Sequence, residues 1–530
     1  MMSRALVLAL GMILAIGVGE KAHAQTSQLK LNVLELGAIN DSTQLSTGAI
    51  QSAIDSCFFN GGGVVYLPEG DFLTGTLILK SNVTLFLEKG ARLHASRNID
   101  DYRMPLDNAT RPILIYANGA TNLSIAGEGI IEGHAQQVYE DLREVDNFIR
   151  EITENAVVAG VEMKRYYIER PDVGLVWFTD CDSVRIEDVT MNASSFWTLH
   201  IMRSRQIAIE QVKIYSSLEK GVNADGIDIN SCQDVLIKGC RIVTGDDAIA
   251  LKTWFELPCD NVLVTDCELS SSSSAFKIGT ESYSDIRNVK VERCKIFDSN
   301  RGLGIVVRDG GTVDNVEFSQ IQIECRRRHF NWWGNGDPIW ILLTKRNSTS
   351  EQSHIRNLKF TNIQAVAEGT SGIYSEHGVD IENITFENVE IKMNPESYVD
   401  KRATHAFYAE HVKGLEFRKC SVQWSDEEEP AWGSALATHL VDGLTIFGMR
   451  ARQGIAGSTT PVMAFNETKN ARLESVLPLD GAELFLSVTG TSSEQIEVTT
   501  MTHGAGDVQW LEVGQEVEKA SSIKVLEDAN

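Results

Sequence analysis

Val235-Leu-Ile-Lys-Gly-Cys240, Val262-Leu-Val-Thr-Asp-Cys267 and Val289-Lys-Val-Glu-Arg-Cys294 repeat one phrase at a constant interval along the chain. In this phrase apolar residues stand at the first, third and sixth positions. Further copies occupy residues 184–189, 207–212, 316–321, 358–363, 384–389 and 415–420, and the interval between successive copies stays similar except for one long step after Val316. A recurring interval of about 20–50 residues is typical of a solenoid or a repeat array.

The alternation inside the phrase predicts strands that bury one face, and it excludes helical repeats. The residue before many copies is an Asn, which tolerates a tight turn; these are Asn261, Asn288, Asn315, Asn357 and Asn383. We therefore predict an all-β, single-domain parallel β-solenoid over residues 25–530. Its inward stack should contain Val184, Ile207, Val235, Val262, Val289 and Val316. Residues 450–530 alternate without a clear spacing, and we expect degenerate coils there.

The first 24 residues have the pattern of a secretory signal peptide. Arg4 precedes an apolar run over residues 5–19, and Ala22-His23-Ala24 supplies a cleavage site. A membrane anchor is the weaker interpretation, because about 20 apolar residues are needed to span a bilayer. We expect cleavage after Ala24, a secreted or periplasmic protein and no membrane insertion.

Charge and cysteine content narrow the possible partners. The net charge of −25 makes nucleic acid and anionic membranes poor partners, and it also repels a polyanionic substrate at long range. Cys240, Cys267, Cys294 and Cys420 share one inward repeat position and are expected to pack as small apolar residues. A metal site is the less favoured interpretation, and a disulfide such as Cys232–Cys259 stays possible.

One basic and aromatic stretch could offset that repulsion locally. Arg326, Arg327, Arg328 and His329 are followed by Phe330, Trp332 and Trp333, and then by Lys345 and Arg346. The stretch falls within the long step between the copies that begin at Val316 and Leu358, so we expect a long loop, and such loops often carry binding residues. Arg side chains suit carboxylates, and aromatic faces suit sugar rings. The alternative is a solvated charge run beside aromatics that cover the coil.

Two motifs bring four carboxylates together. They are Asn223-Ala-Asp-Gly-Ile-Asp228 and Gly245-Asp-Asp-Ala-Ile-Ala250, and the interval from Asp225 to Asp246 matches one turn of the solenoid. Asp225 should then lie on the turn next to Asp246 and Asp247, because stacked strands are about 4.8 Å apart. Crowded carboxylates cannot all ionise freely, so that one of them keeps its proton. A protonated acid beside an ionised base is what glycoside hydrolysis requires.

Structural roles compete with this interpretation. Asn223 and Gly226 could simply shape a turn, and Asp246 and Asp247 could cap one. For Asp228 we favour a structural role, a hydrogen bond to backbone. His200 could be a core histidine or, if it faces the groove, a residue that binds substrate.

The chain resembles the polygalacturonase family of pectin-degrading glycoside hydrolases, family 28, over most of its mature length. The resemblance rests on both carboxylate motifs, on Phe72-Leu-Thr-Gly-Thr-Leu-Ile-Leu-Lys-Ser-Asn-Val-Thr-Leu85 and on Ser195-Phe-Trp-Thr-Leu-His200. It implies a right-handed parallel β-helix that hydrolyses α-galacturonosyl bonds in acidic polysaccharide with inversion. It also implies that Asp246 is the general acid, that Asp225 and Asp247 activate water, and that no metal or cofactor takes part.

Two motifs of that family are altered. Ser273-Ser-Ala-Phe-Lys-Ile-Gly-Thr280 places Ser274 where the family has a His, and it introduces Lys277 nearby. The family's Arg-Ile-Lys is absent, and Arg301-Gly-Leu-Gly-Ile-Val-Val-Arg308 offers Arg301 and Arg308 as replacements. The expected substrate-binding residues are thus Asn223, Lys277, Arg301, Arg308, His200, Arg328, Trp332 and Trp333.

The altered motifs leave several activities open. An exo-acting galacturonosidase or a rhamnogalacturonan-type hydrolase fits as well as ordinary endo-polygalacturonase. Parallel β-helices also occur as polysaccharide lyases, which would need Ca²⁺ and a basic proton abstractor, and as glycan-binding adhesins. The sequence does not specify the polymer, and we expect a monomer.

Overall fold

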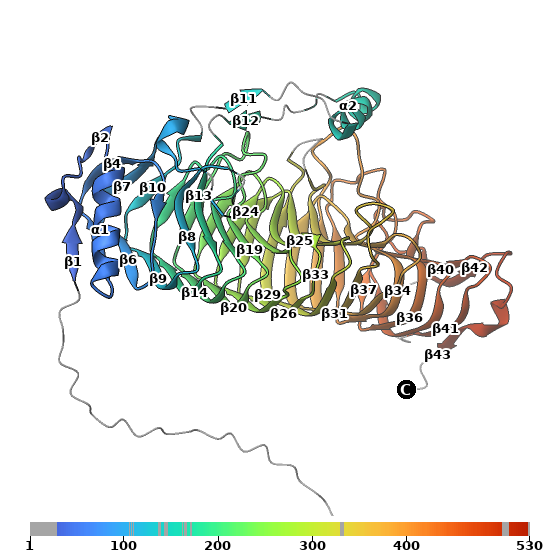
Figure 1. Cartoon of the computed structure of the whole chain (residues 1–530). Helices are drawn as coiled ribbons and strands as arrows, with labels where there is room; N and C mark the ends of the chain where they lie inside the picture. Colours follow the sequence, from blue (N-terminus) through green and yellow to red (C-terminus); the bar gives the residue numbers. More distant parts are fainter. Residues whose placement is uncertain are drawn as a thin grey trace, which may run out of the picture.

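The computed structural model describes residues 29–527 except 105, 108, 110, 136–138, 142–146, 162, 164–166, 170–171, 329–332 and 501–507. The described chain winds into a stack of rungs whose strands pair in parallel with the rungs before and after (Figure 1). It is the right-handed parallel β-helix expected from the repeat and the resemblance. The predicted signal peptide lies outside the described residues.

The repeated phrases form one face of the stack. Val184 pairs with Ile207, Ile207 with Val235, and the register continues without a slip through Val262, Val289 and Val316. All six side chains are at most 2% exposed, which confirms the predicted inward stack. The strands of this face are β14 (Asp182–Glu187), β17 (Arg205–Glu210), β20 (Gln233–Lys238), β23 (Cys259–Thr265), β26 (Ile286–Glu292), β29 (Thr312–Cys325), β31 (His354–Ala367) and β33 (Ile381–Met393).

A second face, which we call the site face, is formed by the strands that precede those of the first face in each rung. Its central strands are β13 (Gly174–Thr179), β16 (Leu199–Met202), β19 (Ile227–Asn230), β22 (Ile249–Thr253), β25 (Ser274–Ser282), β28 (Arg301–Val307), β30 (Asp337–Leu343), β32 (Ser371–Ser375), β34 (Phe407–Arg418) and β36 (Leu436–Phe447). The third face contains β15 (Thr190–Asn192), β18 (Lys213–Tyr215), β21 (Arg241–Thr244), β24 (Glu268–Ser271) and β27 (Lys295–Ser299), and its later rungs are the second halves of β29, β31 and β33 and then β35 (Ser421–Trp424).

Like side chains stack on like inside the coil. The rings of Phe318, Phe360, Phe386 and Phe417 lie 4.9–5.0 Å apart between neighbours and within 13° of parallel. All nine cysteines are buried and unpaired, so the disulfide alternative is wrong and the apolar interpretation is confirmed. The predicted Asn turns are also confirmed, because all five adopt φ of 55–59°.

A helix covers the N-terminal end of the stack, and further strands extend the stack at both ends. Helix α1 (Thr47–Phe59), which the repeat pattern did not predict, covers the N-terminal end and buries Ile50, Ala53, Ile54 and Cys57 at helical spacing (Figure 1). The N-terminal strands are β1 (Lys30–Asn32), β2 (Asp41–Leu45), β3 (Gly63–Leu67), β4 (Gly70–Thr74), β5 (Leu77–Ile78), β6 (Val83–Leu87), β7 (Ala91–Ala95), β8 (Ile113–Asn118), β9 (Thr121–Ala126) and β10 (Ile130–Glu132). The last strands are β37 (Arg450–Ala451), β38 (Pro461–Asn466), β39 (Lys469–Pro478), β40 (Leu484–Thr489), β41 (Glu494–Thr500), β42 (Gln509–Val513) and β43 (Ile523–Glu527).

One excursion leaves the coil between β10 and β13. It contains the antiparallel pair β11 (Tyr139–Asp141) and β12 (Tyr167–Glu169) and the helix α2 (Asn147–Ala159), drawn outside the stack in Figure 1. Neither α1 nor α2 reaches the length and apolarity that crossing a membrane requires, and the same holds for every helix in the described part of the chain.

Candidate active site

The three predicted catalytic acids meet at the start of the site face. The amide of Gly226 donates to the carbonyl of Asp247 at 2.9 Å, which fixes Asp225 one rung from the Asp246/Asp247 pair as predicted. Gly226 permits this approach, because a Cβ there would lie 2.4 Å from the carbonyl oxygen of Ala248.

A serine run on the next rung holds the acid pair. Asp247 accepts hydrogen bonds from Ser273 Oγ at 2.9 Å and from the Ser274 amide at 3.2 Å, and Lys277 Nζ donates to its other oxygen at 2.7 Å. Ser271 Oγ donates to the backbone carbonyl of Asp246 at 2.7 Å. Asp247 is 1% exposed, whereas Asp246 is partly exposed and thus reachable from solvent.

The pKa values of the neighbouring acids Asp246 and Asp247 shift in opposite directions. Burial, together with the Asp225 and Asp247 carboxylates, raises the pKa of Asp246 well above its usual value. Burial acts in the same sense on Asp247, but Lys277 and Lys252 outweigh it and lower the pKa of Asp247. Burial raises the pKa of Asp225 to about 7, with Lys252 opposing the rise. The two shifts therefore favour the protonated form of Asp246 and the ionised form of Asp247.

A buried lysine lies beside this cluster. Lys252 Nζ is 3.7 Å from Asp225, 3.4 Å from Asp228 and 3.4 Å from Glu281, and its side chain is 5% exposed. Burial disfavours its charge, but these carboxylates outweigh that effect and raise the pKa of Lys252. Burial also opposes ionisation of Glu281, yet Lys252 and Lys277 lower its pKa to about 2.

Asp228 corrects one prediction. Neither of its carboxylate oxygens has a hydrogen-bond partner, so the expected bond to backbone is absent. The side chain is fully buried, and burial followed by Asp225 raises its pKa well above the usual range. Asp228 lies in the carboxylate cluster, 3.4 Å from Lys252, and a structural role for it stays a prediction.

Several buried polar atoms without a hydrogen-bond partner lie on this face. Among the described residues they include Trp177 Nε1, Thr198 Oγ1, both ring nitrogens of His200, Asp225 Oδ1, both oxygens of Asp228, Asn230 Nδ2 and Ser274 Oγ. Protein interiors rarely leave such atoms unsatisfied, so their concentration indicates a place that a polar ligand or water completes.

His200 lies on the outward side of β16, in register with Trp177 and Asp228. Its ring meets those of Trp177, Trp197 and Trp254 edge-on at 4.1, 4.9 and 5.4 Å. The side chain is 0% exposed, and burial followed by the charge of Lys252 lowers its pKa well below the usual value. His200 is therefore a neutral imidazole buried among tryptophans, and substrate binding by it stays a prediction.

The arginines Arg301, Arg308 and Arg346 differ in whether an acid of the protein pairs with them. Arg301 is 8% exposed, lies 3.4 Å from Asp337 and covers the ring of Trp340. Arg346 holds both oxygens of Asp309. Arg308 Nε is buried without a partner, and within the described residues no ion pair of Arg308 is formed.

The basic loop is mostly committed to internal contacts. Arg327 pairs with Glu396 and Asp400 and is 2% exposed, while Arg326 and Arg328 both pair with Asp298. Trp332 falls outside the described residues, and Trp333 is partly buried. Asn223 lies exposed at the turn before β19. Substrate binding by Arg328, Trp333 and Asn223 stays a prediction.

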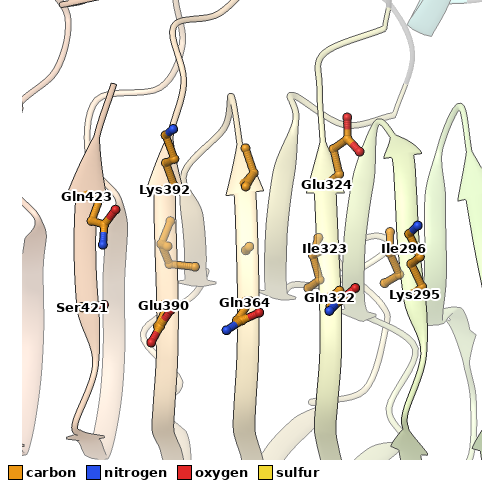
Figure 2. A pocket seen from close by; sticks show the side chains of 13 residues that line it. Lys295, Ile296, Gln322, Ile323, Glu324, Gln364, Glu390, Lys392, Ser421 and Gln423 are labelled. Carbon is orange, nitrogen blue, oxygen red and sulfur yellow. The ribbon is translucent and has the colours of Figure 1, made fainter. Parts of the chain in front are cut away.

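Another groove lies on the third face of the coil. It has a volume of about 300 Å³, and Figure 2 shows Gln322, Gln364 and Glu390 in a row across neighbouring strands. No pair of adjacent acids lies among its lining residues, so we do not assign the chemistry to it.

The family profile of "Glycosyl hydrolases family 28" matches residues 64–407, which include the whole carboxylate cluster. The chain belongs to glycosyl hydrolase family 28. Two relatives are each 28% identical to the chain: a "Probable polygalacturonase" of Vitis vinifera over 240 residues, and an "Exo-poly-alpha-D-galacturonosidase" of Dickeya chrysanthemi over 252 residues. The alignments cover 42% and 41% of this chain, and they span only 44% and 41% of those relatives.

Solved structures agree with the fold of this family 28 chain. An exopolygalacturonase from Thermotoga maritima has a TM-score of 0.59 at 22% identity, covering 74% of this chain and 92% of that one. A family 28 exopolygalacturonase from Yersinia enterocolitica has a TM-score of 0.61 at 19% identity, covering 79% of this chain and 78% of that one.

Sequence reasoning missed Lys252, Glu281 and Ser273. Lys252 follows shortly after the Gly-Asp-Asp motif and lies in a strand otherwise read as core. A charged residue inside the strand Ile249–Thr253 was the available signal, because an unpaired buried lysine is rare.

Proposed function

We propose that this chain hydrolyses α-galacturonosyl bonds in a pectin-type acidic polysaccharide with inversion at the anomeric carbon. The observation that carries the proposal is the placement of Asp246 and Asp247 beside Asp225 on the neighbouring rung, with Lys277 Nζ 2.7 Å from Asp247. The opposite pKa shifts of Asp246 and Asp247 agree with it. The names of the curated relatives support a galacturonan substrate. The chain spans less than half the length of those relatives, so their activities serve here as support.

In the proposed reaction Asp246 donates its proton to the glycosidic oxygen as the bond to the anomeric carbon breaks. A water molecule attacks that carbon from the opposite side, and Asp247, assisted by Asp225, accepts the proton of this water. The sugar leaves as a hemiacetal of inverted configuration. Proton exchange with solvent then returns Asp246 to its acid form and Asp247 to its carboxylate form.

The lysines set the charge balance for this step. Lys277 contacts Asp247 directly and keeps it ionised, so that it can act as a base. Lys252 lies beside the carboxyl groups of Asp225, Asp228 and Glu281 and offsets part of their negative charge. Without these two ammonium groups, mutual repulsion would drive protons onto the cluster.

Arg308 is our candidate for the substrate carboxylate. It is partly exposed and offers a guanidinium without an internal partner. A guanidinium fork matches a uronate carboxylate, and a local cation offsets the net charge of −25. Cleavage of the signal peptide after Ala24 would place the enzyme outside the cytoplasm, where such polymers occur.

A rhamnogalacturonan-type hydrolase is the second candidate. Lys277 faces Gly304 on the next rung, so no side chain stands at the position in register with it. Ser274, at the family's His position, has an unpartnered hydroxyl. The contacts that hold the substrate therefore differ from the usual polygalacturonase set, although the acids are the same.

Product analysis separates the candidates. The purified chain is incubated with homogalacturonan and with rhamnogalacturonan, in buffer with and without EDTA, and products are followed by NMR and by ultraviolet absorbance. We expect a saturated product of inverted anomeric configuration that forms equally fast with EDTA. An unsaturated, absorbing product would identify a lyase, and the absence of any new reducing end would leave only glycan binding.

A further inference from the structure

A cavity of about 380 Å³ lies further along the site face, beside β30, β32 and β34. The residues that matter in it are Trp340, Tyr374, Arg402, His405, Tyr408 and Glu410. It shares the row of the catalytic acids. The Ala248 amide donates a hydrogen bond to the Ser274 carbonyl. Ser274 lies in register with Arg301 on the next strand, and Arg301 lies in register with Asp337 at the cavity wall. Three rungs at about 4.8 Å place the near wall of the cavity roughly 14 Å from Asp247, and two further rungs place Glu410 roughly 24 Å away.

Aromatic rings form the floor of this distal cavity. The Trp340 and Tyr374 rings lie 4.5 Å apart, and those of Tyr374 and Tyr408 lie 5.3 Å apart. Gly372 makes the row continuous, since a Cβ there would come within 2.1 Å of the Tyr374 ring. Partly exposed Tyr and Trp rings combine an apolar body with a polar group, which suits a sugar.

The charges of the cavity do not favour a uronate. Arg301 is paired with Asp337, and Arg402 with Asp400 and with the Asn335 amide oxygen. Burial lowers the pKa of His405, which is therefore neutral at neutral pH. Glu410 accepts the Tyr408 hydroxyl at 3.3 Å, and in the described part of the chain no cation pairs with it. A uronate carboxylate would meet this negative charge, whereas a sugar hydroxyl would find an acceptor.

We propose that the distal cavity binds an uncharged sugar residue, so that the natural substrate carries neutral sugars as well as uronates. This inference rests on the proposed function, because it takes the acids to mark the cleaved bond. Two parts of the site face then bind different sugars. Cations near the acids bind the uronate, and the aromatic floor of the distal cavity with Glu410 binds the neutral sugar.

Equilibrium binding tests the proposal without turnover. The Asp246→Asn variant is titrated calorimetrically with hexagalacturonide and with a hexasaccharide of alternating rhamnose and galacturonic acid. The same titrations are made with Tyr408→Ala, Tyr408→Phe and Glu410→Gln added. Glu390→Gln, the same change in the groove of Figure 2, is the matched control. Thermal melts confirm that each variant is folded.

We expect the alternating hexasaccharide to bind at least about tenfold tighter, which is the size of one or two good hydrogen bonds. Tyr408→Ala and Glu410→Gln should remove most of that preference, and Glu390→Gln should keep it. Tyr408→Phe serves if Tyr408→Ala does not fold. Equal affinities for the two ligands, or a preference that survives both cavity changes, would overturn the inference. A preserved preference in a protein whose wild type releases no sugar from either polymer would instead defeat the hydrolase assignment alone.

Discussion

Lys277 Nζ lies 2.7 Å from a carboxylate oxygen of Asp247, and the two residues come from consecutive rungs of the coil. The contact is buried, since the side chains are 15% and 2% exposed. It distinguishes the two adjacent acids, because Asp246 has no such cationic partner among the described residues.

Replacing Asp246 by Asn should remove the proton donor and keep the shape of the site. Turnover should fall by about 10²–10⁴-fold, which is the usual value of general acid catalysis. The control is Asp314→Asn, a change at an acid of β29 that pairs with Arg356, which should leave turnover intact. Near-normal turnover by Asp246→Asn, or a product of retained configuration, would contradict the mechanism. For inversion the acid and base carboxyls should be roughly 6.5–9.5 Å apart in a substrate complex.

Lys277→Gln should move the acidic limb of the pH–activity profile to higher pH. Burial alone raises the pKa of Asp247, and Lys277 is the first of the groups that reverse this effect. Without the ammonium group Asp247 keeps its proton to higher pH, so kcat should decline at mildly acidic pH and recover in alkali. Lys295→Gln, on the third face, is the control. An unchanged profile for Lys277→Gln would show that Asp247 is not the base.

Lys252→Met should destabilise the fold by about 3–5 kcal/mol, because it leaves buried carboxylates without their cation. Glu281→Gln should restore part of this loss in the double variant. The pKa of Glu281 is lowered from 4.5 to about 2, so its stabilising contribution is present above the unfolded value and is lost as pH falls toward about 2. The difference between wild type and Lys252→Met in urea denaturation should therefore shrink in acid. A constant difference from neutral to acidic pH would argue against this charge balance.

Arg308→Ala should raise KM for a uronate polymer more than it lowers stability. Its guanidinium has no internal ion pair to lose within the described residues, whereas Arg346→Ala breaks contacts with Asp309 and should mainly destabilise. Kinetics on homogalacturonan beside thermal melts will distinguish the two. If Arg308→Ala behaves as wild type on every uronate polymer, the carboxylate of the substrate is bound elsewhere.

Much of the framework could be predicted because it depends on local spacing. An inward Val at a regular interval and an Asn at each turn specify a rung, and the stack repeats it. The position of Asp225 beside Asp247 followed from the same arithmetic. Helix α1 could not be predicted in this way, because it belongs to the end of the stack and to no repeat.

The charge network was less accessible to sequence. Lys252 reaches Asp225, Asp228 and Glu281 through a long side chain that crosses rungs, and no spacing rule reports such reach. The internal pairing of the basic stretch of residues 326–328 was hidden for a different reason. The partners of Arg327, which are Glu396 and Asp400, are far away in the chain, so their pairing was invisible in the local composition.

Between the acids and the distal cavity the strand starts of the site face stay in register, from Ile249 through Phe276 and Leu303 to Ile339. The acids and the distal cavity are separated by a whole number of strands, so their separation can change only by complete rungs. Point substitutions can alter what each place accepts, but they cannot alter the span between the two. Insertion of one rung between β28 and β30 would lengthen the oligosaccharide that reaches both places, and would leave Lys277 on β25 and Arg301 on β28 in their places beside the acids.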